Sequence, residues 1–269
     1  MTCAANKESN NVKFVEKTLS NTCIHYWIND GHYDKCIVFL HPAFGNHTCF
    51  DSQAEYFGKR HKVITIDLIG HGASIGKGTM LDASKCIHEI LIQERIDRAN
   101  IVGVSIGAVI AGDFANKYGE QVSSLICIGG YDINHFDKDL LKGNGNRQVQ
   151  MMLTAMLSIK KFAESNKLIS CYTPEGQEKF YHMNLQFKKS SFRYLATLGA
   201  MINKMETPKR NYTLFIGVGE HDADMAKKAS ELWHEHEPES KLVVFKDAGH
   251  IVNLDIPDEF NKTLDEFIR

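Results

Sequence analysis

The chain has 269 residues, 43% of them hydrophobic, which is enough to bury one sizeable core. Its net charge of -2 and pI near 6.7 exclude the strongly basic surface that wrapping a nucleic acid requires. No apolar run approaches the roughly 18 residues of a membrane span, and residues 1–14 lack the apolar core of a signal peptide, so we expect a cytoplasmic protein without nucleic-acid or membrane partners.

The predicted strands are apolar runs separated by turn residues. Two near the N-terminus, 12–19 and 22–29, have no helix between them, which favours an antiparallel hairpin at the edge of a sheet. Six further runs are rich in Val, Ile and Phe: 35–42, 61–68, 100–105, 123–130, 211–219 and 241–249. Helical spacing fills most of the intervals, at 48–60, 79–96, 106–118 and 223–237. This alternation predicts a doubly wound α/β fold, with a mostly parallel sheet and helices on both faces.

The alternation of strands and helices breaks once, between the strand runs 123–130 and 211–219. Residues 133–206 carry no convincing strand and show helical patterns, among them 147–164 and 188–205. This interval is far longer than the usual connection of about 2 to 6 residues in such folds. We therefore predict a core formed by residues 1–132 and 207–269, with residues 133–206 as a helical cap over one end of the sheet.

Ser105 stands between Gly103 and Gly107, where an apolar strand gives way to a helical pattern. Ligands of an open α/β sheet bind outside the carboxyl ends of its strands, so this position suits chemistry. A side chain at either glycine would collide with so tight a turn, and the N–H groups that begin the next helix favour a developing negative charge. Ser105 is therefore a candidate nucleophile, with a buried or capping serine as the alternative.

A serine hydroxyl needs a base to take its proton and a third group to orient that base. His250 follows the last predicted strand and Asp222 follows the strand before it, so both should reach the sheet edge that carries Ser105. Asp132, which follows the strand at 123–130, and Asp224 are alternatives for the acid. His221 is the weaker candidate for the base, because it would leave His250 without a role.

Five segments, in this order, resemble the motifs of the α/β hydrolase fold family. They are HPAFGNH at 41–47, DLIGHGAS at 67–74, GVSIG at 103–107, GEHD at 219–222 and GHIVNLDIP at 249–257. The resemblance covers essentially the whole chain and implies a triad of Ser105, Asp222 and His250 that catalyses acyl transfer. It also implies that His41, His71 and Asp67 are scaffold residues.

The same resemblance implies an oxyanion hole formed by the backbone N–H groups of Ala43 and Ile106, with Phe44 as the alternative to Ala43. The chain departs from the family at Pro42, which stands where glycine is common and has no N–H to offer. Family members that hydrolyse epoxides or remove halides carry aspartate at the position of Ser105. The serine therefore argues against both activities.

Neither the cysteines nor the histidines indicate a metal or cofactor. Seven cysteines lie scattered without CxxC pairs, a pattern typical of free thiols in a reducing compartment. His234 and His236 are two residues apart, which places them on different faces of a helix rather than in a zinc-binding motif. We expect no disulfide, no metal and no cofactor.

Only the insertion 133–206 bears on the substrate. It is rich in Met and Phe, and the candidates for an apolar pocket wall are Phe44, Met152, Met156 and Phe187. Its 11 Lys and Arg against 6 Asp and Glu either attract an acidic substrate or an anionic carrier, or form a solvated surface.

The sequence therefore predicts a serine hydrolase that cleaves carboxylic esters of small to medium apolar substrates, as a monomer or homodimer. Two alternatives within enzymes are a thioesterase and a carbon-carbon bond hydrolase. An alternative from another class is a sensor that keeps the triad and uses the pocket to bind a small ligand and recruit a partner.

Overall fold

Eight strands form one sheet in the computed structural model, which describes residues 12–141, 145–202 and 206–268. The strand order is β1-β2-β4-β3-β5-β6-β7-β8. Strands β3 to β8 run parallel, whereas β2 is antiparallel to both β1 and β4. The strands are β1 (Phe14–Thr18), β2 (His25–Asn29), β3 (Cys36–Leu40), β4 (Lys62–Ile66), β5 (Ala99–Val104), β6 (Val122–Ile128), β7 (Thr213–Gly219) and β8 (Lys241–Phe245). The predicted parallel sheet with an antiparallel N-terminal edge is confirmed.

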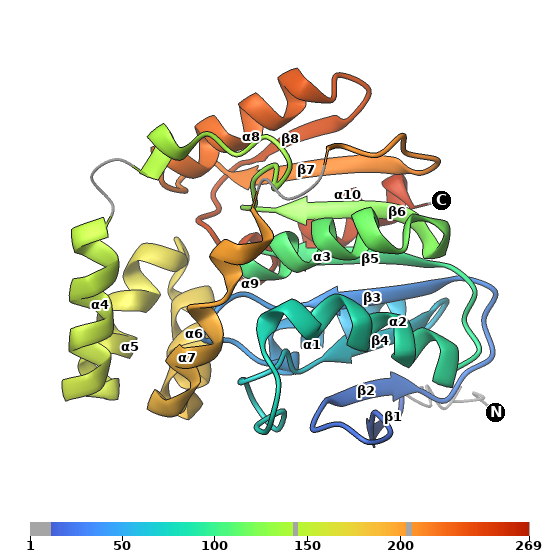
Figure 1. The fold of residues 1–269 in the computed structure, drawn as a ribbon, viewed down its shortest axis with the longest axis horizontal. Coiled ribbons are helices and arrows are strands. Elements are labelled where there is room, and N and C mark those ends of the chain that lie inside the picture. Colours follow the sequence, from blue (N-terminus) through green and yellow to red (C-terminus); the bar gives the residue numbers. More distant parts are fainter. Residues whose placement is uncertain (1–11, 142–144, 203–205, 269) are drawn as a thin grey trace, which may run out of the picture.

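Helices cover both faces of this sheet (Figure 1). One apolar core lies between the sheet and helices α2, α3 and α8, and the second lies between the sheet and helices α1, α9 and α10. Their bounds are α1 (Asp51–Phe57), α2 (Ala83–Gln93), α3 (Ile106–Lys117), α8 (Asp224–His236), α9 (Val252–Asp255) and α10 (Pro257–Phe267), and short 3-10 turns occupy η1 (His47–Phe50), η2 (Met80–Asp82) and η3 (Gly119–Gln121). Every residue of β3 and β5 is buried, which explains why these strands read as continuous apolar runs.

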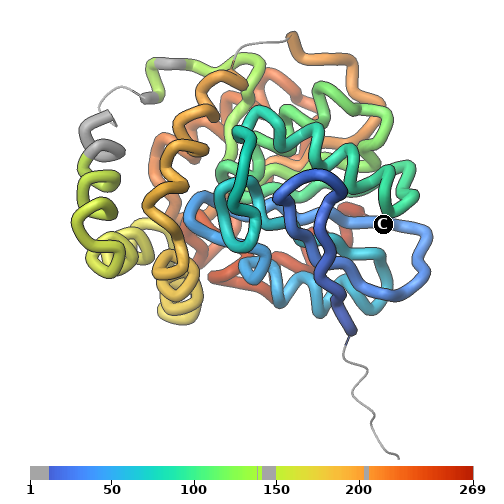
Figure 2. The backbone as a smooth tube through the Cα atoms, turned by 60° about the horizontal axis from the view of Figure 1, so that its bottom comes forward, coloured from blue at the N-terminus to red at the C-terminus, as the bar shows by residue number. Residues whose placement is uncertain are grey.

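All regular elements of the insertion between β6 and β7 are helical in the part that the structure describes. It contains η4 (Lys138–Leu141), α4 (Gly145–Leu157), α5 (Ile159–Ser170), α6 (Pro174–Gln186), η5 (Lys189–Ser191), α7 (Phe192–Leu195) and η6 (Leu198–Met201). These elements gather at one end of the sheet in the ribbon and in the tube view (Figures 1 and 2). Met183 and Phe187 line a small pocket together with Gly45 and Gly70, from the loops that follow β3 and β4, so the insertion lies at the carboxyl ends of the strands. Its role as a cap stays a prediction.

Two helical patterns in the insertion are divided into shorter elements in the structure. The helical pattern over 147–164 forms two helices, α4 and α5, because the Ser158 hydroxyl accepts a hydrogen bond from the Lys161 N–H and caps a new helix. The helix expected over 188–205 is replaced by the short turns η5, α7 and η6 over residues 189–201, and residues 203–205 lie outside the described part.

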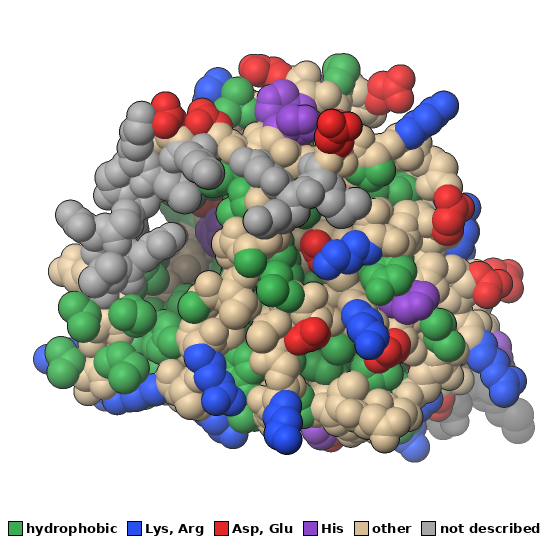
Figure 3. Space-filling model, in the orientation of Figure 1, with side chains coloured by type: hydrophobic (Ala, Val, Ile, Leu, Met, Phe, Trp, Pro, Cys, Tyr) green, Lys and Arg blue, Asp and Glu red, His purple; other side chains and the backbone are tan. Residues whose placement is uncertain are grey.

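Hydrophobic side chains gather on the left of Figure 3, over α4 and its neighbours. Leu157, the last residue of α4, is 87% exposed. No helix among the described residues is long and apolar enough to cross a bilayer.

Six cysteines are free thiols, and four of them are buried. Cys3 lies outside the described residues.

Candidate active site

Ser105 occupies a sharp turn between β5 and α3. Its backbone has φ 56° and ψ -116°, a left-handed conformation that a residue other than glycine rarely adopts. The turn is held by the Ser105 N–H, which donates to the Ile128 carbonyl at 2.8 Å, and by the Ser105 carbonyl, which accepts from the Ala108 N–H at 2.9 Å. The side chain therefore stands at the N-terminus of α3, at the carboxyl end of the central strand.

The two glycines that flank this turn leave no room for a side chain. A Cβ on Gly103 would collide with the backbone of Gly107, and a Cβ on Gly107 would collide with the carbonyl of Leu40 in the neighbouring strand. The steric reason predicted for both glycines is therefore present in the structure.

His250 and Asp222 form a hydrogen-bonded pair beside this turn. The distance from His250 Nδ1 to Asp222 Oδ2 is 2.8 Å, and the other carboxylate oxygen accepts from the Ala223 N–H at 2.7 Å. Burial alone would lower the pKa of His250, but the charge and hydrogen bond of Asp222 outweigh it and raise that pKa above its usual value. Among the described residues, no hydrogen bond joins the Ser105 hydroxyl to His250.

Gly129, which follows β6, makes room for the imidazole. It has φ 58°, and a Cβ there would lie 2.9 Å from both Nδ1 and Cε1 of His250. Its neighbour Ile128 accepts the hydrogen bond from the Ser105 N–H. The end of β6 therefore contacts both the Ser105 turn and the His250 imidazole, a link that the sequence pattern alone did not reveal.

The alternative acids and the alternative base have other partners. Asp132 lies 3.0 Å from His135 and 3.4 Å from His236. The side chain of Asp224 is fully exposed and pairs with Lys227. His221 stacks on Tyr172, with ring centroids 3.7 Å apart.

The loop after β3, which holds Ala43, is fixed by the buried His41. Its Nδ1 donates to the Pro42 carbonyl at 2.8 Å and its Nε2 accepts from the Leu68 N–H at 3.0 Å, which defines one neutral tautomer. Burial lowers the pKa of His41 to about 4, so the ring stays neutral near pH 7. This arrangement is consistent with the predicted scaffold role of His41.

Asp67 joins the same loop to the loop after β4. One carboxylate oxygen accepts from the His47 N–H and the other from the Ala73 N–H, both at 2.7 Å. Burial would raise the pKa of Asp67, but the hydrogen bonds and charges of His47 and His41 lower it below its usual value. His71 is buried, its ring centroid lies 5.3 Å from that of Phe187, and both residues line the same small pocket, so the scaffold role of His71 stays a prediction.

Phe44, adjacent to Ala43, carries the loop into contact with the insertion. Its φ of 65° is left-handed, and its ring centroid lies 4.8 Å from Phe162, 4.9 Å from Phe187 and 6.0 Å from Phe192. These four aromatic residues are named here the aromatic wall. Phe44 and Phe187 were predicted from the sequence as pocket residues.

Met152 and Met156, the other two predicted pocket residues, lie on α4. Their exposed fractions are 42% and 50%. Such exposure gives no support to a place in an enclosed pocket, because α4 turns these side chains toward solvent.

Asp255 is a site residue that the sequence analysis missed. It accepts hydrogen bonds from the N–H of Gly249, next to His250, at 2.8 Å, and from the N–H of Thr173, at the start of α6, at 2.8 Å. A carboxylate within an otherwise apolar stretch was the available signal. Asp255 therefore links the histidine loop to the insertion.

Comparisons with known proteins identify the family of this chain. Residues 37–263 match the alpha/beta hydrolase family. A pimeloyl-[acyl-carrier protein] methyl ester esterase from Nitrosomonas europaea is 22% identical over 240 residues, which are 85% of this chain and 94% of that protein. Epoxide hydrolase 3 from Xenopus tropicalis is 22% identical over 281 residues, covering 91% of this chain and 74% of that protein.

A solved structure of a thermophilic esterase from Thermogutta terrifontis superposes with a TM-score of 0.77 at 22% identity, covering 96% of this chain and 98% of that one. The family match spans most of the chain, from β3 to α10, and includes the serine turn and the His250 loop. The chain belongs to the alpha/beta hydrolase family.

Proposed function

We propose that the protein is a serine hydrolase that cleaves carboxylic esters of small to medium apolar substrates. The observation that carries this proposal is the 2.8 Å hydrogen bond between His250 and Asp222, at the same edge of the sheet as the strained turn of Ser105. Because Nδ1 of His250 donates to the carboxylate, Nε2 keeps a lone pair that can take a proton from serine.

The first half of the proposed reaction acylates Ser105. Its oxygen attacks the ester carbonyl as Nε2 of His250 takes the hydroxyl proton, and the carbonyl oxygen becomes an oxyanion. The oxyanion accepts hydrogen bonds from the N–H groups of Ala43 and Ile106. The intermediate then collapses, its bond to the leaving alkoxide breaks, and His250 returns the proton to that alkoxide.

The second half repeats these steps with water as the nucleophile. His250 takes a proton from water, the resulting hydroxide attacks the acyl carbon, and Ser105 leaves with the proton from His250. Asp222 stays ionised throughout and stabilises the imidazolium that forms in each half. Each oxyanion donor contributes about 100-fold to 1,000-fold to the rate, because the charge it meets develops only in the transition state.

The aromatic wall supports an apolar acyl or alkyl group in the substrate. Phe44 adjoins the proposed oxyanion donor Ala43, and Phe162, Phe187 and Phe192 surround its ring. A hydrocarbon chain packed against these rings would be removed from water, and few polar groups would have to be buried with it. The insertion would in this way act as a cap that selects the substrate.

The esterases among the compared proteins support ester cleavage, whereas the epoxide hydrolase suggests epoxide opening as an alternative reaction. Ser105 stands at the turn where, by the family resemblance, epoxide hydrolases carry aspartate. We therefore favour acyl transfer over epoxide opening. We also propose a cytoplasmic location, supported by the six free thiols among the described residues.

Turnover of p-nitrophenyl esters from acetate to decanoate tests the proposal, with Ser105→Ala as the variant. We expect many turnovers by the wild type and a loss of about 10,000-fold or more in kcat/KM for Ser105→Ala. Ser123→Ala, at an exposed position in β6, is the matched control and should keep wild-type activity. No wild-type turnover on any ester would refute ester cleavage and lead to assays of thioesters and carbon-carbon substrates.

A further inference from the structure

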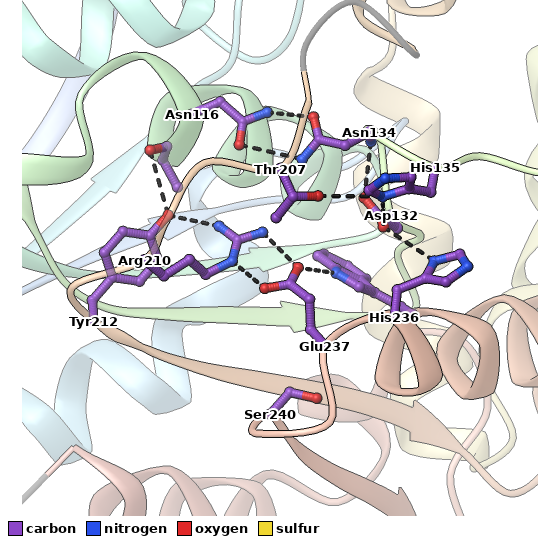
Figure 4. A network of polar contacts seen from close by, with 12 residues as sticks. Asn116, Asp132, Asn134, His135, Thr207, Arg210, Tyr212, His236, Glu237 and Ser240 are labelled. Atoms are coloured by element: carbon purple, nitrogen blue, oxygen red, sulfur yellow. Dashed lines mark hydrogen bonds and ion pairs between the residues drawn. The ribbon is translucent and has the colours of Figure 1, made fainter.

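A second cluster of ionisable side chains lies where the chain leaves the core for the insertion (Figure 4). Asp132 and His135 belong to the segment that follows β6, and His236 is the last residue of α8. Asp132 Oδ2 lies 3.0 Å from His135 Nδ1 and 3.4 Å from His236 Nδ1. One donor atom from each of the three residues lies within 4.8 Å of the others.

The carboxylate of Asp132 is held in place by its own loop. The residue is 4% exposed, and its Oδ1 accepts a hydrogen bond from the Asn134 N–H at 2.8 Å. The Asn134 side chain in turn bonds to Asn116 on α3, at 2.7 Å. Oδ2 is therefore the oxygen that faces the two imidazoles. The hydrogen bonds from Asn134 and Asn116 hold the carboxylate in the way that neighbouring groups orient metal ligands.

Two of the three spacings between these donors suit a tetrahedral metal ion. Bonds of about 2.0 to 2.2 Å from zinc to nitrogen or oxygen place neighbouring ligand atoms about 3.3 Å apart. The two oxygen-to-nitrogen distances, 3.0 and 3.4 Å, lie close to that value. The third spacing, between one ring nitrogen of each imidazole, is no more than 4.8 Å.

The imidazoles are accessible, and their surroundings suit a cation. Their side chains are 50% exposed for His135 and 39% for His236, so an ion can enter and water can complete its coordination. Thr207 Oγ1, on the segment that returns to the core, lies 3.2 Å from His135 Nδ1. The positive charge of Arg210, in the same network, is paired with Glu237.

We propose that Asp132, His135 and His236 form a binding site for one divalent transition-metal ion of the zinc type. This differs from the sequence expectation of no metal, because the fold joins residues about 100 positions apart. Two nitrogen ligands and one carboxylate suit Zn²⁺ or Co²⁺ rather than Ca²⁺ or Mg²⁺. The bound ion would tie the outgoing segment of the insertion to α8 and stabilise that junction.

Calorimetric titration of the full-length, chelator-treated protein with Zn²⁺ tests this site. We expect one strong site per chain in the wild type and affinity at least about tenfold weaker in His236→Gln, because one of three ligands is lost. His234→Gln, on the same helix with its ring bonded to Ser240, is the matched control and should bind as the wild type does. His221→Gln gives a second control, in the exposed cluster of Glu220, His221 and Asp247.

Two further readouts make the result independent of catalytic activity. Co²⁺ should give the intense visible absorption of a four-coordinate ion in the wild type and in His234→Gln, but not in His236→Gln. Zn²⁺ should also raise the Tm of the wild type more than that of His236→Gln, since binding only the folded state stabilises it. Equal Zn²⁺ affinity in the wild type and in His236→Gln, or no binding by the wild type, would overturn the proposal.

Discussion

The serine turn and the insertion differ in how tightly the backbone restricts each position. At the turn, Ser105 is held at φ 56°, and neither Gly103 nor Gly107 has space for a Cβ. In the insertion, a Cβ on Gly199 would meet no atom within 4 Å, and Leu157 is 87% exposed. The serine turn therefore tolerates no added atom at either glycine, whereas the exposed positions 157 and 199 of the insertion can change at little cost.

This contrast divides the proposed function between two regions. The class of reaction depends on side chains at the carboxyl ends of β5, β7 and β8, while the choice of substrate depends on the part of the insertion that packs on Phe44. Substitutions in the first region should change the rate for every ester. Substitutions in the second should change the ratio of rates between esters.

Among substitutions that leave Ser105 in place, Asp222→Asn should cause the largest loss of activity. Without the carboxylate, His250 loses its orientation and the stabilisation of its charged form, so kcat should fall about 10,000-fold on every ester. Steady-state kinetics on acetate and hexanoate esters measures this. Asp224→Asn is the matched control, since that carboxylate is fully exposed. A comparable loss of activity in this control would contradict the assignment of Asp222 as the acid.

Gly107→Ala compared with Gly199→Ala tests the steric contrast directly. The new methyl at position 107 would collide with the Leu40 carbonyl, which should cost about 3 kcal/mol or more and lower the Tm by about 6 °C or more. The same change at Gly199 has open space and should leave the Tm within about 2 °C. Thermal unfolding followed by circular dichroism measures both, and equal shifts would contradict the contrast.

The pH dependence of kcat/KM should arise from His250 in the core, and changes in the insertion should not affect it. His250 acts as a base only when neutral, and its pKa lies above the ordinary value of 6.5, so kcat/KM should rise with pH through a midpoint above 6.5. Below that midpoint it should fall about tenfold per pH unit. A pH-stat assay on an aliphatic ester measures the profile, which Leu157→Ala should leave unchanged. A flat profile between pH 6 and 8 would argue against His250 as the base.

Phe187→Ala should give the smallest effect, and one that depends on the substrate. Shortening this side chain removes part of the aromatic wall, so kcat/KM for hexanoate relative to acetate should fall about tenfold. A loss of folded protein would lower both measured rates by the same factor, so it would not change this ratio. Leu157→Ala and Met156→Ala, both at exposed positions, should leave the ratio within about twofold. A similar change in these controls would place the pocket elsewhere.

The sheet and the turns at its edge could be predicted from the sequence because local and global signals agree there. The central strands β3 and β5 are buried on both faces, so each reads as a continuous apolar run, and the residues that follow such a run fall at the ligand-binding edge. Ser105, Asp222 and His250 were placed by this rule together with the family resemblance.

Tertiary contacts explain where prediction from the sequence was less accurate. The helical period runs unbroken through Ser158, and only its capping hydrogen bond shows that a new helix begins. Helix α6 was missed although Thr173 caps it and Pro174 opens it, which is a usable signal. The cluster of Asp132, His135 and His236 joins two distant segments, and no local pattern predicts that contact.

Covalent labelling of Ser105 tests the central claim most directly. The wild type would be treated with an alkyl fluorophosphonate, and the adduct would be located by intact mass and peptide mapping. An activated nucleophile predicts one adduct per chain, on Ser105, with labelling abolished in Ser105→Ala and strongly slowed in His250→Gln. An adduct that persists in Ser105→Ala, or a wild type that stays unlabelled, would contradict the assignment of Ser105 as the nucleophile.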